Sequence, residues 1–321
     1  MRFVAIGSAH PHMEAMVRGL RALAGVELVG LADRNAERLA AWQAGVGVPA
    51  WADHMAMLAD VRPDFAAVCP ANSEKAGVIA DCAAQGVHVL ADKPLVTRRT
   101  ELEKVEAALR ESAVEVWACF ELRYQAPFVA MRELIAAGEI GEVVSLHATL
   151  PHRLRSLPRT AEMLDSERNG GLLVDLGCHN MDLARWLTGR EPVEITATMS
   201  NRRFTDLPRF YDNAQVFCRF EGGIAVYLEQ SWLHPDASRL SGDCCTAAGT
   251  EGTLEYRASD GLLTLTTFAR GDETITPDPS PVGLLEDFVR ALRGEGTGNL
   301  STVETLASTR ATLIAHESAV T

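Results

Sequence analysis

The chain has 321 residues, of which 47% are hydrophobic and 23% are charged, and this composition excludes a disordered or fibrous protein. Acidic residues outnumber basic ones, and the formal net charge of −13 argues against a nucleic-acid or anionic-membrane partner. Because no apolar run reaches the ~20 residues of a membrane helix, and the apolar stretch after Met1 is too short for a signal peptide, we expect a cytoplasmic protein.

Short apolar segments alternate with amphipathic ones over the first 120 residues. We expect strands at residues 3–6, 26–32, 65–69, 87–91 and 114–118. We expect helices at residues 11–23, 35–44, 75–84 and 100–111, where apolar residues recur at helical spacing. Buried strands that alternate with helices predict an α/β domain with a doubly wound parallel sheet of the Rossmann type.

A different rhythm begins after residue 120. Strand-like segments follow one another at residues 143–150, 193–199, 214–220, 224–231, 253–257 and 262–268. Helical segments lie at residues 127–137, 176–187, 282–292 and 303–315. Consecutive strands with segregated helices indicate an α+β domain with a mostly antiparallel, open sheet. We therefore predict two domains, residues 1–120 and residues 121–321.

The loop after the first expected strand carries part of a dinucleotide-binding fingerprint. The fingerprint G-x-G-x-x-G requires glycine at positions 7, 9 and 12, where this chain has Gly7, Ala9 and His12. His10 and Pro11 complete the loop, and proline suits the first position of a helix whose positive end would face a pyrophosphate. The glycine pattern is weak by itself, but its place between a strand and a helix predicts a dinucleotide-binding loop.

An acidic residue ends the second expected strand. Asp33 lies where a carboxylate hydrogen-bonds the ribose hydroxyls of NAD and repels the 2′-phosphate of NADP. The neighbouring Arg34 could instead pair with that phosphate. We therefore expect NAD as the cofactor, with NADP not excluded. The alternative is an exposed acid in a turn with no ligand.

His10 and His12 could be interpreted as a metal-binding pair. No carboxylate or cysteine cluster accompanies them in the sequence, and the seven cysteines of the chain include no C-x-x-C pair. We expect loop histidines that cap a helix, reduced thiols, and no metal.

Two further stretches are more specific. Residues 90–94 read Leu-Ala-Asp-Lys-Pro, and residues 170–182 read Gly-Gly-Leu-Leu-Val-Asp-Leu-Gly-Cys-His-Asn-Met-Asp. With the nucleotide-binding pattern, they resemble the glucose–fructose oxidoreductase, inositol dehydrogenase and rhizopine-catabolism family (Gfo/Idh/MocA). The resemblance covers nearly the whole chain. It implies an NAD(P)-binding Rossmann domain and a C-terminal domain that binds substrate and forms oligomers.

The resemblance also implies roles for individual residues. Lys93 matches the family's catalytic lysine, and Asp175 and His179 match its acid and histidine on the substrate side. Asp182 matches the final carboxylate of the motif and is expected to bind substrate. A loop that commonly lies against the cofactor corresponds to Pro70 and Asn72. The chain departs from the family pattern at three places: the first loop, Asp92 in place of glutamate, and Glu74-Lys75 where a histidine is common.

These residue types suit the oxidation of an alcohol. A histidine with a pKa near ~6.5 can accept the proton of a hydroxyl group, and a lysine can stabilise the developing alkoxide. Asp175 and His179 are four residues apart, so a helix that includes both places them on one face. We expect Lys93 and His179 to converge on one substrate oxygen between the domains, with Asp175 at the start of its helix. Taken singly, Asp175 could be a helix cap and His179 a buried structural histidine.

Two residues next to the expected domain junction are further candidates. Arg123 and Tyr124 follow the last expected strand of the first domain and could face nicotinamide or substrate. We expect them to bind substrate.

The strands of the second domain predict a contact with a second copy. Helices at one end of the sheet cannot cover both of its faces, and an uncovered apolar face is a typical subunit contact, unless loops cover it. We expect a homodimer or homotetramer built through this sheet, with contacts from Val216, Phe217, Phe220, Val226, Tyr227, Leu228 and Trp232.

Three functions remain open from the sequence. The first is an NAD(P)-dependent dehydrogenase that acts on a secondary alcohol of a sugar, cyclitol or related polyol. The second is an NAD-assisted glycosidase or lyase on the same fold, in which the oxidation is transient. The third is a non-catalytic sugar or dinucleotide sensor, against which the presence of Lys93, Asp175 and His179 argues.

Overall fold

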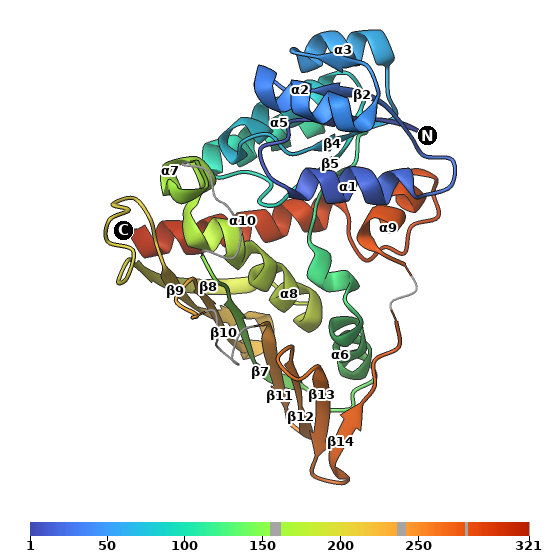
Figure 1. Cartoon of the computed structure of the whole chain (residues 1–321). Coiled ribbons are helices and arrows are strands. Elements are labelled where there is room, and N and C mark those ends of the chain that lie inside the picture. The colour runs from blue at the N-terminus through green and yellow to red at the C-terminus, as the bar shows by residue number, and fades with distance from the viewer. Residues whose placement is uncertain (155–161, 236–241, 280–281, 321) are drawn as a thin grey trace. The chain divides into compact units, whose positions relative to one another are not determined.

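The alternating pattern of the N-terminal part forms a six-stranded parallel sheet in the computed structural model, which describes residues 1–154, 162–235, 242–279 and 282–320 (Figure 1). Contacts divide the chain into two units. Unit 1 comprises Met1–Cys119 with Val282–Thr309, and unit 2 comprises Phe120–Pro281 with Arg310–Thr321.

Unit 1 is built on a sheet with the strand order β3-β2-β1-β4-β5-β6, which is the order of a dinucleotide-binding Rossmann fold. The strands are β1 (Arg2–Ile6), β2 (Glu27–Ala32), β3 (Ala50–Trp51), β4 (Phe65–Val68), β5 (His88–Ala91) and β6 (Val116–Ala118). The helices are α1 (His12–Arg21), α2 (Ala36–Val46), α3 (His54–Val61), α4 (Lys75–Ala84), α5 (Arg99–Arg110) and α9 (Leu284–Leu292). The predicted parallel sheet is therefore confirmed, whereas β3 and α3 are additions that the sequence analysis missed.

Residues near the C-terminus also belong to unit 1. Phe288 on α9 lies edge-on against Phe65 and Trp117, with ring centroids 5.5 and 5.3 Å away. The Thr302 hydroxyl, at the start of α10 (Thr302–Val320), accepts a hydrogen bond of 2.9 Å from the backbone N–H of Val116 in β6. Residues 282–309, which the helical pattern had assigned to the second domain, thus pack with the first sheet.

Unit 2 contains an eight-stranded sheet in the order β14-β13-β12-β11-β7-β10-β9-β8. All neighbouring strands are antiparallel except β7 and β10, so the predicted mostly antiparallel sheet is confirmed. The strands are β7 (Val143–Pro151), β8 (Pro192–Ser200), β9 (Asn213–Phe220), β10 (Ala225–Ser231), β11 (Cys244–Gly249), β12 (Gly252–Arg257), β13 (Leu262–Thr267) and β14 (Gly271–Ile275). The helices are α6 (Ala126–Ala136), α7 (Ser166–Asn169), α8 (Cys178–Thr188) and the C-terminal part of α10.

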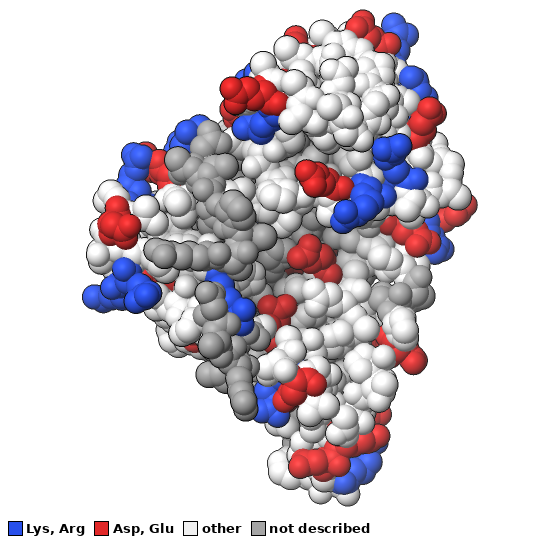
Figure 2. Space-filling view, viewed as in Figure 1, with Lys and Arg blue, Asp and Glu red and all other residues white. Residues whose placement is uncertain are grey.

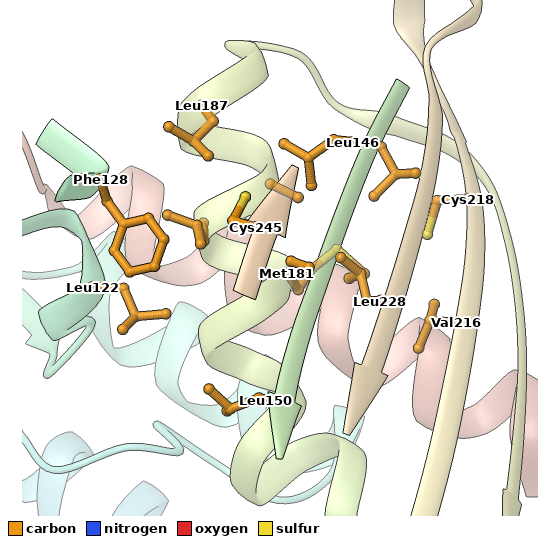
Figure 3. Close-up of a cluster of buried hydrophobic side chains, with 14 of the residues drawn as sticks. Leu122, Phe128, Leu146, Leu150, Met181, Leu187, Val216, Cys218, Leu228 and Cys245 are labelled. Carbon is orange, nitrogen blue, oxygen red and sulfur yellow. The ribbon is translucent and has the colours of Figure 1, made fainter. Parts of the chain in front are cut away.

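One face of this sheet forms the core of unit 2. Alternate residues of the strands, among them Leu146, Val216 and Leu228, point toward Phe128 of α6 and Met181 of α8 (Figure 3). Because successive residues of a strand point to opposite faces, buried residues alternate with half-buried or exposed ones along β9 and most of β10.

This alternation corrects the predicted contact face. Val216, Phe220, Val226, Leu228 and Trp232 are buried in the core of unit 2. Phe217, which is 56% exposed, and the half-buried Tyr227 lie on the other face of the sheet. The sequence analysis placed both sets of residues on one face, although neighbouring positions of a strand alternate.

The surface carries both signs of charge. On the face drawn in Figure 2, the Lys and Arg side chains of the described residues are interspersed with Asp and Glu and do not gather into one patch. Within the described part of the chain, no helix is long and apolar enough to cross a bilayer.

Candidate active site

The phosphate loop is fixed by close contacts at the carboxyl ends of β1, β2 and β4. Gly7 has a φ of +76°, and a Cβ at this position would overlap the backbone of Pro70. The backbone N–H of Gly7 donates to the Ala32 carbonyl at 2.7 Å, and that of Ala9 donates to the Cys69 carbonyl at 3.0 Å. Glycine is therefore required at position 7 by conformation and by space, in agreement with the one glycine of the fingerprint that this chain keeps.

Asp33 at the end of β2 is surrounded by donors. Its carboxylate accepts hydrogen bonds from Ser8 N–H (2.9 Å) and Oγ (2.8 Å), and from Asn35 N–H (2.8 Å). The Arg38 guanidinium adds two more, from Nε at 3.1 Å and Nη2 at 3.0 Å. Burial alone would raise the pKa of the Asp33 carboxyl, but the bonds from Arg38, Asn35 and Ser8 lower it below its ordinary value.

The sequence analysis selected Arg34 at this turn and missed Arg38. Arg34 is exposed, whereas Arg38 lies in the first turn of α2, whose N-cap Asn35 accepts a bond from the Arg38 N–H at 2.9 Å. An arginine three residues after a capping asparagine can reach back to the preceding strand end. The three-residue spacing of Asn35 and Arg38 was therefore the sequence signal that could have identified Arg38.

A cavity of about 280 Å³ in unit 1 adjoins these groups. Its lining includes Gly7, Asp33, Arg34, Arg38 and Pro70. A small pocket that joins a glycine loop to a carboxylate and two guanidinium groups fits the adenosine end of a dinucleotide. The residues that the sequence singled out for the cofactor are thus gathered within unit 1. Asn72, another of them, begins the short helical turn Asn72–Glu74 before α4.

A buried lysine fixes the turn after β5. Lys75 is 0% exposed, and its ammonium donates to the backbone carbonyls of Asp92 (2.7 Å), Lys93 (3.1 Å) and Pro94 (2.8 Å). The half-buried Lys93 therefore sits on a backbone held at three successive carbonyl groups. Lys75 lies in helical register with the buried Val78.

The sequence analysis noted Lys75 only as a departure from the family pattern. A lysine on the apolar face of a helix is a signal that could have identified it, because such a position buries the ammonium and requires partners.

Asp92 contacts the phosphate loop directly. Its carboxylate Oδ1 lies 2.9 Å from Nδ1 of His12, and the Cys69 thiol donates to Oδ2 at 3.5 Å. Burial would raise the pKa of the Asp92 carboxyl, but the His12 bond and the charges of Lys75, His12 and Lys93 lower it well below its usual range. The expectation that no carboxylate accompanies the two loop histidines was wrong, since Asp92 is distant from them in sequence and close in space.

The glycine motif of unit 2 leads into a wide helical turn. Gly170 and Gly171 have φ values of +92° and +77°, and the Gly171 N–H donates to Oδ1 of Asn169 at 2.6 Å. Leu173–Gly177 then forms a π-helical turn that runs directly into α8. Single π-turns of this kind occur frequently at functional sites.

Asp175 lies within this π-turn and is half-buried. Leu172 already has helical backbone and precedes the π-turn, so the prediction that Asp175 starts the helix is wrong. The sequence does not show where an extra residue widens a turn, and the start of the helix was placed at least three residues too late. His179 lies one turn further on, in the first turn of α8, and is buried.

α8 is held against the sheet by small and polar residues. Asn180 Nδ2 donates to the carbonyls of Ala148 and Glu229, each at 3.3 Å. A Cβ on Gly177 would come within 3.3 Å of the Gln230 side chain. The glycine that precedes His179 by two positions therefore allows the start of α8 to approach β10 closely.

Arg123 and Asp182, both predicted to bind substrate, form a buried pair. Arg123 Nε donates to Oδ2 of Asp182 at 2.8 Å and Nη2 donates to Oδ1 at 2.7 Å, and both side chains are 1% exposed. This paired geometry favours a structural role, in which the short turn Glu121–Tyr124 is fixed to α8. Tyr124 is buried in the same turn.

The predicted site residues therefore form two groups. Unit 1 holds Gly7, Asp33, Asp92 and Lys93 at the carboxyl edge of its parallel sheet, and unit 2 holds Asp175 and His179 on one helical segment. The convergence of Lys93 and His179 on one oxygen stays a prediction.

The strand order and the glycine loop of unit 1 define a dinucleotide-binding protein of the Rossmann type. Family models agree with both parts of the chain. Residues 1–120 match the oxidoreductase family with an NAD-binding Rossmann fold, and residues 128–255 match the GFO/IDH/MocA C-terminal domain. The chain belongs to the Gfo/Idh/MocA family of oxidoreductases, as the two motifs predicted.

Named relatives act on polyhydroxylated compounds. The chain is 28% identical over 210 residues to inositol 2-dehydrogenase 2 of Saccharopolyspora erythraea, which covers 65% of this chain and 60% of that protein. It is 26% identical to D-xylose 1-dehydrogenase (NADP+) 2 of Haloferax volcanii, over 100% of this chain and 98% of that one. An oxidoreductase of Agrobacterium radiobacter, solved with NAD+, L-tartaric acid and magnesium, shares the fold with a TM-score of 0.86 at 18% identity, over 100% of this chain and 96% of that one.

Proposed function

We propose that the protein is an NAD(P)-dependent dehydrogenase that interconverts a secondary alcohol and a ketone in a sugar, cyclitol or related polyol. The observation that carries this proposal is the Lys93 turn, which Lys75 holds at three carbonyls at the edge of a nucleotide-binding sheet. The names of the inositol and xylose dehydrogenases support the substrate class.

The residues of unit 1 fit a nicotinamide dinucleotide. The loop of Gly7, Ala9, His10 and Pro11 would hold the diphosphate, because the positive end of the α1 dipole lies there and favours an anion. Residues at the end of β4 and β5, among them Pro70, Asn72, Asp92 and Lys93, would line the nicotinamide side. When bound, the cofactor accepts a hydride from the alcohol carbon or returns it to the carbonyl carbon.

The chain itself handles the proton and the charge. We propose that His179 accepts the hydroxyl proton during oxidation and that the Lys93 ammonium stabilises the oxygen as it becomes negative. Asp175, on the same helical segment, would orient the imidazole or hold a neighbouring hydroxyl group. Because Lys75 fixes the Lys93 backbone, the ammonium needs little reorganisation during the reaction.

We propose that the adenosine end accepts both NAD and NADP. Asp33 can accept ribose hydroxyl groups, but its charge is already compensated by two bonds from Arg38. A compensated carboxylate repels a 2′-phosphate less, and Arg34 adds a second cation at the same turn. Arg38 is then the residue that sets the preference between the two cofactors.

A substrate panel tests the proposal. Sugars, inositols, sugar acids and amino sugars would be assayed with NAD and with NADP for the absorbance of the reduced nicotinamide. We expect one reduced cofactor for each substrate oxidised. Product formation without net reduced cofactor would identify the NAD-assisted elimination instead. Dinucleotide binding with no turnover on any substrate class would favour a sensor.

We also propose a second copy of the chain as a partner, contacting the exposed face of the unit 2 sheet. Phe217 and Tyr227 on this face have ring centroids 4.9 Å apart, and the Tyr227 and His147 rings are 4.7 Å apart. The three residues lie side by side on neighbouring strands, Phe217 opposite Tyr227 and Tyr227 opposite His147. An aromatic row on an open sheet suits an isologous contact in a homodimer or homotetramer.

Light scattering with matched variants tests this contact. Phe217→Arg should reduce the mass at micromolar concentration toward that of one chain, because the charge would be buried in the contact. Phe268→Arg is the control, since Phe268 is 87% exposed and follows the last residue of β13. A wild-type protein with the mass of a single chain would contradict the proposal.

A further inference from the structure

Three possible metal ligands meet where the phosphate loop approaches the end of β5. One ligand atom each from His10, His12 and Asp92 lies within 4.8 Å of the other two. His12 Nδ1 is 2.9 Å from Asp92 Oδ1, and the two imidazole rings have centroids 3.7 Å apart. Two segments distant in sequence thus bring two imidazoles and one carboxylate to one place.

Two of the three residues, His12 and Asp92, depart from the expected sequence patterns, and their side chains contact each other. Position 12 has glycine in the dinucleotide fingerprint and histidine here, and position 92 has glutamate in the family motif and aspartate here. The side chain is shorter by one methylene at position 92 and longer at position 12, and the two meet at hydrogen-bond distance. A dinucleotide loop does not need this pair, so the pair requires another explanation.

The surroundings restrict which ion could bind. Lys75 and Lys93 bring positive charge close to Asp92, although the Lys75 ammonium is bonded to backbone carbonyls. The thiol of Cys69 lies at the other carboxylate oxygen. Positive charge disfavours ions held by electrostatics through oxygen ligands, such as Mg²⁺ and Ca²⁺. It is less adverse to ions that form strong bonds with imidazole nitrogen.

We propose that His10, His12 and Asp92 bind one divalent transition-metal ion of the Zn²⁺, Co²⁺ or Fe²⁺ type. Two imidazoles and a carboxylate are a ligand set that such ions accept, and three protein ligands leave a coordination position for water or for an oxygen of a small molecule. His12 and Asp92 exchange their mutual hydrogen bond for the ion. Metal binding needs neither dinucleotide nor substrate, so it can be tested separately from the dehydrogenase activity, although His10 and Asp92 also belong to the proposed cofactor site.

Titration of the full chain with Co²⁺ tests the site. After dialysis against a chelator, Co²⁺ is added and followed by its visible absorption, and Zn²⁺ is measured by calorimetry. We expect one ion per chain and displacement of Co²⁺ by Zn²⁺. Binding of Mg²⁺ as strong as that of Co²⁺, or no Co²⁺ binding at micromolar concentration, would overturn the proposal.

Variants identify the ligands. His12→Gln and Asp92→Asn should each weaken Co²⁺ binding by about 10-fold or more, and so should His10→Ala, which leaves the His12–Asp92 pair in place. His54→Asn is the matched control, because His54 also lies 2.9 Å from a carboxylate, that of Asp81, in the same unit. Thermal melts identify any variant that fails to fold. Equal affinity in wild type and His10→Ala would overturn the three-ligand site.

Discussion

The two units of the chain stabilise their buried charged groups in different ways. In unit 1, Lys75 bonds to three backbone carbonyls, and Asp33 accepts from the backbone N–H groups of Ser8 and Asn35 as well as from the Ser8 hydroxyl and Arg38, all in loops or helix starts at the carboxyl edge of the sheet. In unit 2, Arg123 and Arg185 bond to carboxylates, those of Asp182 and Glu191, around one helix. The buried charged groups of unit 1 therefore stabilise loop conformations, and those of unit 2 fix the position of α8. Substitutions should affect loop geometry in the first unit and helix placement in the second.

The largest effect is expected at His179, which belongs to neither the Arg123–Asp182 nor the Arg185–Glu191 pair of unit 2. His179→Asn should lower kcat by about 10²–10⁴, because it removes the proposed proton acceptor, and should leave the Kd for NAD nearly unchanged. The acidic limb of the rate–pH profile should disappear. Kinetics over a pH series and fluorescence titration of NAD measure both.

Lys93→Met is the corresponding substitution in unit 1. It should lower kcat and also weaken NAD binding, since Lys93 belongs to the nucleotide-binding unit. A His179→Asn enzyme with near-full kcat and an unchanged pH profile would instead place the base at Lys93 or Asp175.

A smaller effect should follow from Lys75, a positioning residue. Lys75→Met leaves three buried carbonyls without their donor, which should cost about 3 kcal/mol of unfolding free energy. It should lower kcat by about 10- to 100-fold with little change in KM, because the Lys93 backbone is released. Urea unfolding and steady-state kinetics provide the two measurements.

Arg110→Met, at the exposed C-terminal end of α5, is the control for charge, since it removes a cation of the same unit outside the lining of the cofactor cavity. A Lys75→Met enzyme that loses stability but keeps its kcat would show that the turn needs no such support.

The comparison also separates what the sequence could predict from what it could not. Apolar runs and helical spacing sufficed for the type of each sheet, because each pattern extends over many residues, but β11 and β14 of unit 2 were not predicted. β3 has two residues and gives no periodic signal. The helices of residues 282–309 were recognised, but periodicity does not say against which sheet a helix packs.

The same reasoning applies to the candidate site. Lys93, Asp175 and His179 were identified from motif spacing, whereas the π-turn at Leu173–Gly177 depends on packing that local sequence does not encode. The contact between His12 and Asp92 joins residues 80 positions apart. Only the folded sheet brings them together.

A substitution of Arg38 should change the preference of unit 1 between NAD and NADP. Arg38→Ala should free the Asp33 carboxylate for ribose hydroxyls and remove a cation near the 2′-phosphate. The Kd ratio of NADP to NAD should rise by about 10- to 100-fold, the range of one charge-assisted bond. Fluorescence titration with both cofactors measures the ratio without turnover. Glu37→Ala on the same helix is the control, and an unchanged ratio in Arg38→Ala would contradict the role of Arg38.

The buried Asp92 of unit 1 and the half-buried Asp243 of unit 2 provide the prediction with the smallest expected effect. In unit 1, His12 and two lysines lower the pKa of Asp92. In unit 2, burial and the negative charge of Glu121 raise the pKa of the Asp243 carboxyl to about 6. The folded state thus binds the Asp243 proton more tightly than the unfolded chain, whose aspartate has a pKa near ~3.9. This contribution to stability is complete below pH ~4 and is lost as the pH rises through about 6.

Asp243→Asn cannot ionise, so it should escape this loss. Relative to wild type, the variant should gain about 1–2 kcal/mol of unfolding free energy between pH ~4.5 and ~7.5, with most of the change between pH ~4.5 and ~6. Urea unfolding at a series of pH values measures the difference, and subtracting the two curves removes the titration of every other group. Asp260→Asn, at an exposed turn of the same unit, should give a flat difference. A flat difference for Asp243→Asn as well would mean that unit 2, like unit 1, compensates its buried carboxylate with positive charge.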